Sequence, residues 1–295
     1  MERGLSSTTV HHIHSVLRNA LKRAVRQNKV ARNVAEIADS PRIERKEVRS
    51  LSWQEVDRLL RAAVGDRLEA LYIIAVTTGA REGEILGLRW RHLDLEAGTL
   101  RIAGDLQQVP KGTTPPRYAT PLSERLMILE PKTKQSRRLI SLVPRAIEAL
   151  RDHRKRQQVE REYAGDLWHD FDLVFTNEVG GPIEATNFLK RSFRPLLKMA
   201  GLPPITFHEL RHTCASLLLE EGTHPAIVAN LLGHARTSTT LDIYSHVAPS
   251  LASGIPSIIT ARLEQFSSEL SSELSSIPQN PSPTAGVSNS KSSVN

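Results

Sequence analysis

The hydrophobic pattern changes twice along the chain, and this order constrains the fold more than any other feature. The spacing of apolar residues predicts helices first, then short strands, then helices again. The early helices are predicted over 53–64, 67–78 and 82–88. The strands surround Leu100 and Ile102 and cover 125–130 and 137–143, the last two joined by PKTKQS. They are expected to form one small antiparallel meander of three, in which each strand pairs with the next. The later helices are predicted over 144–162, 185–200, 208–220, 224–232 and 238–245. The pattern therefore predicts an α+β fold that is mainly α-helical.

Four stretches differ in composition or pattern from the strands and helices described above. Residues 8–31 predict one helix, and a polar linker follows it over 38–50. The stretch 104–123 is rich in Pro, Gly and Thr and is expected to be a surface loop. The serine-rich stretch 267–295 predicts a disordered tail.

Charge and cysteine content favour an intracellular protein with a polyanionic partner. The chain has 39 Lys and Arg against 32 Asp and Glu, a formal net charge of +7. Its single cysteine, Cys214, cannot form an intramolecular disulfide, which fits a reducing cytoplasm. The sequence has no apolar run long enough to span a membrane and no secretory signal, so a cytoplasmic protein without membrane association is expected.

Four cations recur at helical steps on the predicted first helix. They form either a solvated face or a ridge that contacts DNA phosphates, and the sequence leaves both interpretations open. These residues are Arg18, Lys22, Arg26 and Lys29.

The C-terminal third contains three short motifs, FHELRH, LLGH and LDIYSHV. His208 and Arg211 lie three residues apart on a predicted helix, so they share a face. Gly233 is placed as a helix C-cap, and His234 follows it directly. Tyr244 lies on the last predicted helix. Each of these residues alone is more often structural than catalytic.

Two further motifs lie upstream. Arg81 follows an apolar helix, and a partly buried arginine there needs a partner, which Glu84 can supply. Lys132 and Lys134 lie in a predicted turn, where lysines are usually only solvated. Taken together, two arginines, two histidines, a lysine and a tyrosine are what phosphodiester chemistry needs without a metal. The chain has no GxxxxGK phosphate loop, and no cofactor is expected.

The motifs AREGE, PKTKQS, HELRH, LLGH and TLDIYSHV occur in the order of the phage integrase family of tyrosine recombinases, which the chain resembles over about residues 49–250. The resemblance implies a tyrosine recombinase catalytic domain, over 49–266, in a site-specific integrase of a mobile genetic element. It also implies double-stranded DNA as partner, a homotetramer on two DNA sites, and possible accessory bending or directionality factors.

The resemblance also implies a role for each motif residue in cutting and rejoining DNA. Arg81 and Arg211 would clamp the non-bridging oxygens of the scissile phosphate. Tyr244 would attack that phosphate and form a 3′-phosphotyrosine. His208 would take the tyrosine proton or stabilise the phosphate, and His234 would donate a hydrogen bond to it.

Three more residues have implied supporting roles. Lys132, at the family's hairpin-lysine position, would protonate the leaving 5′ oxygen as general acid. Lys134 is the alternative for that role and otherwise a DNA contact. Glu84 would orient Arg81 or His208 from behind.

The N-terminus departs from the family pattern. Members usually carry a four-helix core-binding domain before the catalytic domain, whereas here about 48 residues precede it. The helix over 8–31 resembles the last helix of that domain. Residues 1–48 are therefore expected to be a partial helical core-binding segment and linker, with catalysis less efficient as a result.

Three alternatives remain open. His208, Glu209 and His212 spell HExxH, the zinc metalloprotease signature, although Arg211 between the two ligands would repel a metal. A catalytically impaired DNA-binding remnant of an integrase is the second. A type IB topoisomerase, which shares the chemistry, is the third.

Overall fold

The computed structural model describes residues 5–38, 49–130, 137–233 and 240. The chain separates into two compact units, Met1–Arg49 and Ser50–Asn295, which are described here one at a time. The predicted helix over 238–245, apart from Thr240, and the predicted tail over 267–295 lie outside the described residues.

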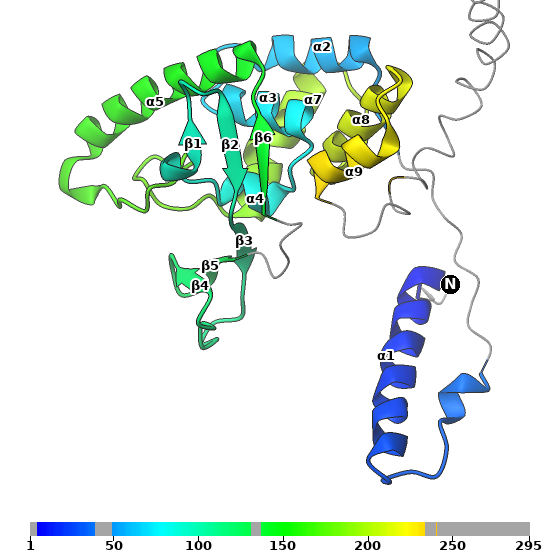
Figure 1. Ribbon diagram of the computed structural model, residues 1–295. Coiled ribbons are helices and arrows are strands. Elements are labelled where there is room, and N and C mark those ends of the chain that lie inside the picture. The colour runs from blue at the N-terminus through cyan, green and yellow to red at the C-terminus, as the bar shows by residue number, and fades with distance from the viewer. Residues whose placement is uncertain (1–4, 39–48, 131–136, 234–239, 241–295) are drawn as a thin grey trace, which may run out of the picture. The chain divides into compact units, whose positions relative to one another are not determined.

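The first unit is built on helix α1, Ser7–Arg26 (Figure 1). A short 3-10 turn, Val34–Glu36, folds back on it, and the ring of His14 bonds the carbonyl of Ala35 at 2.8 Å. The helix is shorter than the predicted 8–31 because the chain turns at Asn28, whose φ of 55° is left-handed. No residue of α1 is buried within this unit.

The second unit is organised around helix α3, Glu69–Thr78, in which eight of ten residues are buried. A helix that is apolar on all sides belongs in a core. It packs against the long helix α5, Pro144–Ala164, and against α8, Phe207–Glu220. Helix α2, Trp53–Ala62, begins with the predicted capping box of Ser52 and Glu55.

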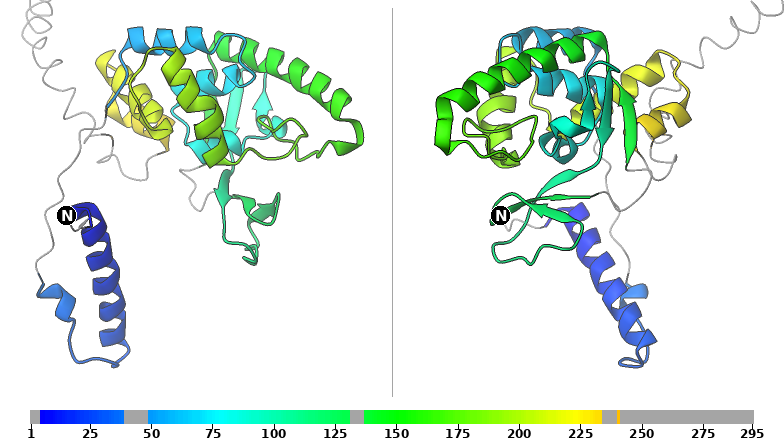
Figure 2. Two further views of the ribbon diagram at one scale, coloured as in Figure 1. Left: turned by 180° about the vertical axis from the view of Figure 1, so that it is seen from behind. Right: turned by 60° about the vertical axis from the view of Figure 1, so that its left-hand side comes forward.

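Two small antiparallel sheets complete this unit (Figure 2). The first has the order β1-β2-β6, and its strands are Leu93–Asp94, Thr99–Ile102 and Arg138–Ser141. The second has the order β3-β5-β4, and its strands are Asp105–Gln108, Leu126–Leu129 and Ala119–Pro121. The second sheet projects from the helical body as an arm.

The α+β, mainly helical fold class is confirmed, but the expected strand pairing is wrong. The strand predicted over 125–130 pairs with β3 and β4, and not with the strand predicted over 137–143, which pairs with β2 as β6. The stretch 104–123, expected to be a loop, contains β3 and β4. Leu106 is the only apolar residue of β3, so the sequence shows almost no alternation of apolar and polar residues there. The strand forms through its pairing with β5.

The remaining α-helices of this unit are short. The predicted helix over 185–200 is interrupted by a π-helical turn, Leu189–Phe193, that separates α6 from α7. The short helices are α4, Glu82–Leu86; α6, Ala185–Phe188; α7, Arg194–Met199; and α9, Pro225–Leu232. Within this unit α8 and α9 lie at one end and the free end of α5 at the other (Figure 1).

Gly79 closes α3 where α8 and α9 pack closely, and its replacement tests that packing. Its φ of 58° is left-handed, and a Cβ there would collide with the side chain of Leu232 and approach the Sγ of Cys214 to 3.3 Å. We expect Gly79→Ala to destabilise the fold by about 2–4 kcal/mol, from left-handed strain plus overpacking.

Gly65→Ala is the matched control, because Gly65 is left-handed with no atom within 4 Å of such a Cβ. It should cost about 1–2 kcal/mol in urea unfolding. Equal losses for the two variants would contradict the packing described.

Candidate active site

Arg81 is placed by the turn between α3 and α4. After Gly79 ends α3, Arg81 takes the N-cap position of α4 in an extended conformation. Its backbone N–H donates to one carboxylate oxygen of Glu84 at 2.8 Å, and its guanidinium donates to the other at 2.8 Å. The Arg81 side chain remains 39% exposed, so part of its guanidinium is available to a ligand.

Glu84 is buried and holds a second arginine that the sequence analysis did not single out. Arg138 on β6 donates to both oxygens of Glu84, at 3.1 and 2.9 Å, and its Nε donates to the carbonyl of Leu231 at 2.6 Å. Burial alone would raise the pKa of Glu84, but bonds to Arg138 and Arg81 outweigh burial and lower it. The carboxylate is therefore ionised and fixes both guanidinium groups.

Arg211 on α8 is buried and bonded only to backbone carbonyls among the described residues. Its Nη1 donates to Gly79 at 2.8 Å, and its Nη2 donates to Leu232 at 2.7 Å. Burial and the nearby charge of Arg81 lower the pKa of Arg211 to about 10, so it stays charged at neutral pH. A guanidinium has five N–H donors, so several remain for an anion.

His208 lies one turn before Arg211, at the N-terminal end of α8. Burial and the charges of Arg211 and Arg81 lower the pKa of His208, so the neutral imidazole is favoured at neutral pH. The ring of His212 meets it edge to face, with centroids 5.0 Å apart. His208 is exposed, whereas His212 is half-buried.

The charges around this cluster do not balance. Among the described residues, the guanidinium groups of Arg81 and Arg138 hydrogen-bond one carboxylate, that of Glu84, whereas Arg211 hydrogen-bonds none. Asp105 interacts with Arg81 only through its charge. Such an excess of fixed, partly desolvated cations beside a neutral imidazole favours an anion with several acceptor oxygens. The cluster can therefore bind a phosphate and stabilise charge that develops on it.

The structure brings together Arg81, Glu84, His208 and Arg211 among the predicted site residues. Glu84 bonds Arg81, as one of its two expected roles requires, and no hydrogen bond joins it to His208 within the described residues. Four other predicted residues lie outside the described part of the chain: Lys132, Lys134, His234 and Tyr244. Gly233 is a left-handed C-cap with a φ of 68°, as predicted, and His234 follows it in sequence.

Arg138 was missed although its strand carries a usable signal. In β6 it lies two residues before Ile140, which is 3% exposed. Residues two apart in a strand face the same side of the sheet, so Arg138 also faces the buried side. An arginine on a buried face needs a partner, as Glu84 here provides.

The cations predicted on the first helix are exposed in the first unit. Arg18 pairs with Glu36 at 3.7 Å, whereas Lys22, Arg26 and Lys29 are exposed, and Lys29 lies beyond the end of α1. A surface ion pair at this distance contributes little to stability. The role of these four cations in phosphate contact stays a prediction.

The HExxH motif takes a helix-capping arrangement. The carboxylate of Glu209 accepts from the backbone N–H of Thr206, which completes a capping box at the start of α8. Among the described residues there is no group of three or more His, Cys, Asp or Glu that could hold a metal ion. The geometry therefore gives Glu209 of this motif a structural use.

Comparison with known proteins identifies the family. The model of the phage integrase family matches residues 49–250, and the chain belongs to this family. It is 36% identical over 262 residues to a tyrosine recombinase XerC-like protein of Caldanaerobacter subterraneus, covering 84% of this chain and 64% of that protein. It is 34% identical over 255 residues to an integrase of Streptomyces ambofaciens, covering 85% and 63%.

A solved structure shares the fold. The Tn1549 transposon integrase in complex with transposon right end DNA superposes with a TM-score of 0.67 at 22% identity, covering 82% of this chain and 76% of that one. This chain spans less than two thirds of the length of the two relatives described above. No helix among the described residues is long and apolar enough to cross a membrane.

Proposed function

We propose that this protein is a site-specific DNA recombinase that cuts and rejoins double-stranded DNA through a 3′-phosphotyrosine. The observation that carries the proposal is the cluster of three guanidinium groups around one carboxylate, next to the neutral imidazole of His208. Family membership supports the same assignment.

In the proposed reaction the hydroxyl oxygen of Tyr244 attacks the scissile phosphorus. The bond from phosphorus to the 5′ oxygen breaks, and the DNA 3′ end becomes linked to Tyr244. Arg81 and Arg211 bind the non-bridging oxygens and offset the added charge of the five-coordinate transition state. Because the phosphotyrosine keeps the energy of the broken phosphodiester, rejoining needs no ATP.

Proton transfers complete this reaction. His208 accepts the tyrosine proton or stabilises the phosphate, and His234 donates a hydrogen bond to the phosphate. Lys132 protonates the departing 5′ oxygen, with Lys134 as the alternative donor. With guanidinium groups to neutralise the phosphate, the proposed mechanism uses no metal or cofactor.

The proposal extends to organisation and partners. Residues 49–266 would be the catalytic domain, and residues 1–48 a core-binding segment whose cations contact DNA. The active assembly would be a homotetramer on two DNA sites, with accessory bending or directionality factors. Because its substrate is DNA of a mobile element, we propose the cytoplasm as its compartment.

A covalent trapping assay tests the proposal. The protein is incubated with nicked duplexes of randomised sequence, in which the short fragment that carries the new 5′-hydroxyl diffuses away, so that rejoining cannot occur. The expected result is a protein–DNA adduct that survives denaturation and is absent for Tyr244→Phe. Duplex binding without any adduct would instead favour the impaired DNA-binding remnant. Relaxation of supercoiled DNA by a monomer, without strand exchange, would favour a type IB topoisomerase.

The pH dependence of adduct formation tests His208. Since its pKa lies below the ordinary 6.5, the rate should fall only in mildly acidic buffer, where the imidazole becomes protonated and cannot accept the tyrosine proton. We expect His208→Gln to be slower by about 100-fold and to lose this acidic limb. The control is His212→Gln, on the same helix, which should keep the limb. Single-turnover rates between about pH 5 and 8 give the comparison. An unchanged limb in His208→Gln would exclude this histidine as the base.

A further inference from the structure

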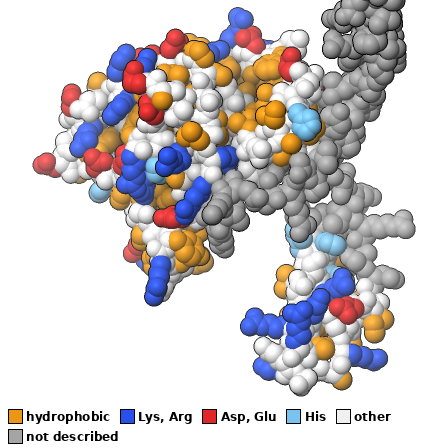
Figure 3. Space-filling view, viewed as in Figure 1, with side chains coloured by type: hydrophobic (Ala, Val, Ile, Leu, Met, Phe, Trp, Pro, Cys, Tyr) orange, Lys and Arg blue, Asp and Glu red, His pale blue; other side chains and the backbone are white. Residues whose placement is uncertain are grey.

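A second cationic region lies apart from the active-site cluster. A cleft of about 1110 Å³ opens between the first sheet and α5, and none of Arg81, Glu84, His208 or Arg211 lines it. Figure 3 shows Lys and Arg side chains gathered on the face that carries β1 and β2. The basic residues that line the cleft are Arg91, His92, Arg101, Arg151, Arg154 and Lys155.

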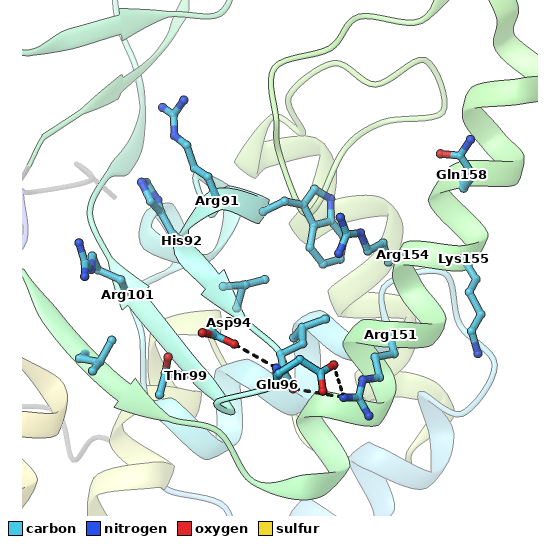
Figure 4. Close-up of a pocket in the computed structure, with 14 residues that line it drawn as sticks. Arg91, His92, Asp94, Glu96, Thr99, Arg101, Arg151, Arg154, Lys155 and Gln158 are labelled. Carbon is cyan, nitrogen blue, oxygen red and sulfur yellow. Dashed lines mark hydrogen bonds and ion pairs between the residues drawn. The ribbon is translucent and has the colours of Figure 1, made fainter.

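The cations come from two opposing walls (Figure 4). On the sheet side, Arg101 projects from the solvent face of β2, where it alternates with the buried Leu100 and Ile102. Arg91 and His92 lie beside it, on the 3-10 turn Trp90–His92.

The opposite wall is one face of α5. Arg151, Arg154 and Lys155 follow steps of three and four residues, which bring side chains to the same side of a helix. Together with Gln158 they line the cleft over about 10 Å, at roughly 1.5 Å of rise per residue.

The two acids in the cleft are engaged locally. Asp94 accepts from the backbone N–H groups of Glu96 and Ala97, at 3.1 and 2.8 Å, and so closes the turn between β1 and β2. Glu96 pairs with Arg151 at 2.8 Å. Lys155 pairs with Asp152 at 2.9 Å, so the excess positive charge of the cleft comes mainly from its other arginines.

The other arginines have no strong carboxylate partner in the described part of the chain. The guanidinium of Arg154 lies over the ring of Trp90, 5.1 Å from its centroid. The Nε of Arg91 comes only within 3.5 Å of Asp172, and its side chain is 59% exposed. Arg101 is exposed, and no carboxylate of the described residues pairs with it.

His92 reports the positive potential of the cleft. Burial lowers its pKa first, and the charges of Arg91, Arg89 and Arg101 lower it further, with only Asp172 opposing them. A site that disfavours one more positive charge favours an anion.

We propose that this cleft binds the phosphate backbone of duplex DNA at a distance from the phosphate that is cut. This inference rests on the proposed function, because that function makes DNA the polyanion at hand. The cationic wall of α5 is longer than a single phosphate needs. Each strand of a duplex carries a phosphate for every roughly 3.4 Å of helix axis, so a wall of this length can meet more than one. Arginine forks suit phosphate oxygens, and contacts of this kind position DNA without reading its sequence.

The salt dependence of DNA binding tests the cleft. The test variant is Arg101→Gln with Arg154→Gln, which removes one unpaired arginine from each wall. The matched control is Arg58→Gln with Arg61→Gln, an equal charge change at exposed positions of α2 outside the cleft. Both variants and the unmodified protein are titrated onto a duplex of about 40 base pairs between roughly 50 and 200 mM salt.

We expect the cleft variant to bind at least about tenfold more weakly, with a slope of log K against log salt shallower by about 2, because two phosphate contacts are lost. The control should match the unmodified protein. Adduct formation by the cleft variant at limiting DNA should fall with its affinity, and saturating DNA should restore most of the rate, because no catalytic group is changed.

The outcomes separate this inference from the proposed function. If the adduct forms and the cleft variant binds like the control, the cleft does not bind DNA, although the function stands. A loss of DNA affinity confined to the cleft variant, with no adduct from any protein, supports the cleft and rejects the recombinase. Failure of the unmodified protein to bind any duplex contradicts both.

Discussion

Arg211→Met is expected to reduce the rate of adduct formation by at least about 1000-fold, while DNA affinity changes much less. Arg211 is buried and held by two backbone carbonyls, and in the proposed reaction its remaining N–H donors contact a phosphate oxygen. Removing such contacts acts mainly on the transition state, where the phosphate carries most charge. Single-turnover cleavage and separate binding titrations give the two quantities.

Two controls separate catalysis from folding in the Arg211 experiment. Arg156 also donates to a backbone carbonyl, that of Asp66 at 3.0 Å, but lies away from the cluster, so Arg156→Met should leave the cleavage rate unchanged. Arg211→Lys keeps the charge without the fork and should remain well below the unmodified protein. A rate for Arg211→Met within about tenfold of the unmodified protein, at saturating DNA, would remove Arg211 from the mechanism.

Glu84→Gln has the second largest expected effect, on stability and activity together. Among the described residues it removes the one carboxylate that hydrogen-bonds Arg81 and Arg138, and a buried cation such as Arg138 is strongly unfavourable without its counter-charge. We expect a loss of about 3–5 kcal/mol in unfolding free energy and a cleavage rate lower by about 100-fold, because Arg81 loses its fixed position.

A double variant and a pH series complete the test of Glu84. Adding Arg138→Met to Glu84→Gln should cost less than the sum of the two single changes, because the groups bond each other. The folded pKa of Glu84 is lowered, so its contribution to stability is complete above the ordinary 4.5 and is lost as the pH falls through the folded value. Glu84→Gln should lack this part of the acid sensitivity. Additive costs, or an identical pH profile, would show that the carboxylate does not organise the site.

Much of this site could be predicted because its members occur in short motifs. Arg81 and Glu84 lie three residues apart, as do His208 and Arg211, so local helix geometry already pairs them. Gly233 could be predicted as a C-cap for the same local reason.

What could not be predicted depends on contacts between distant segments. Arg138 meets Glu84 across 54 positions only because β6 pairs with β2 and not with the strand before it. The cleft joins the turn after Arg89 to one face of α5, and the spacing of apolar residues says nothing about where two such elements meet. The short strands β3 and β4 were hidden because their polar residues gave no alternation.

The central claim is that the arginine cluster presents a DNA phosphate to Tyr244. Proteolysis of the trapped adduct followed by mass spectrometry of the DNA-bearing peptide tests it most directly. The account predicts a nucleotide 3′-phosphate on Tyr244, a free 5′-hydroxyl on the released strand, and loss of this peptide in Arg211→Met. A phosphate carried by any other residue, or linked through a 5′ end, would contradict it.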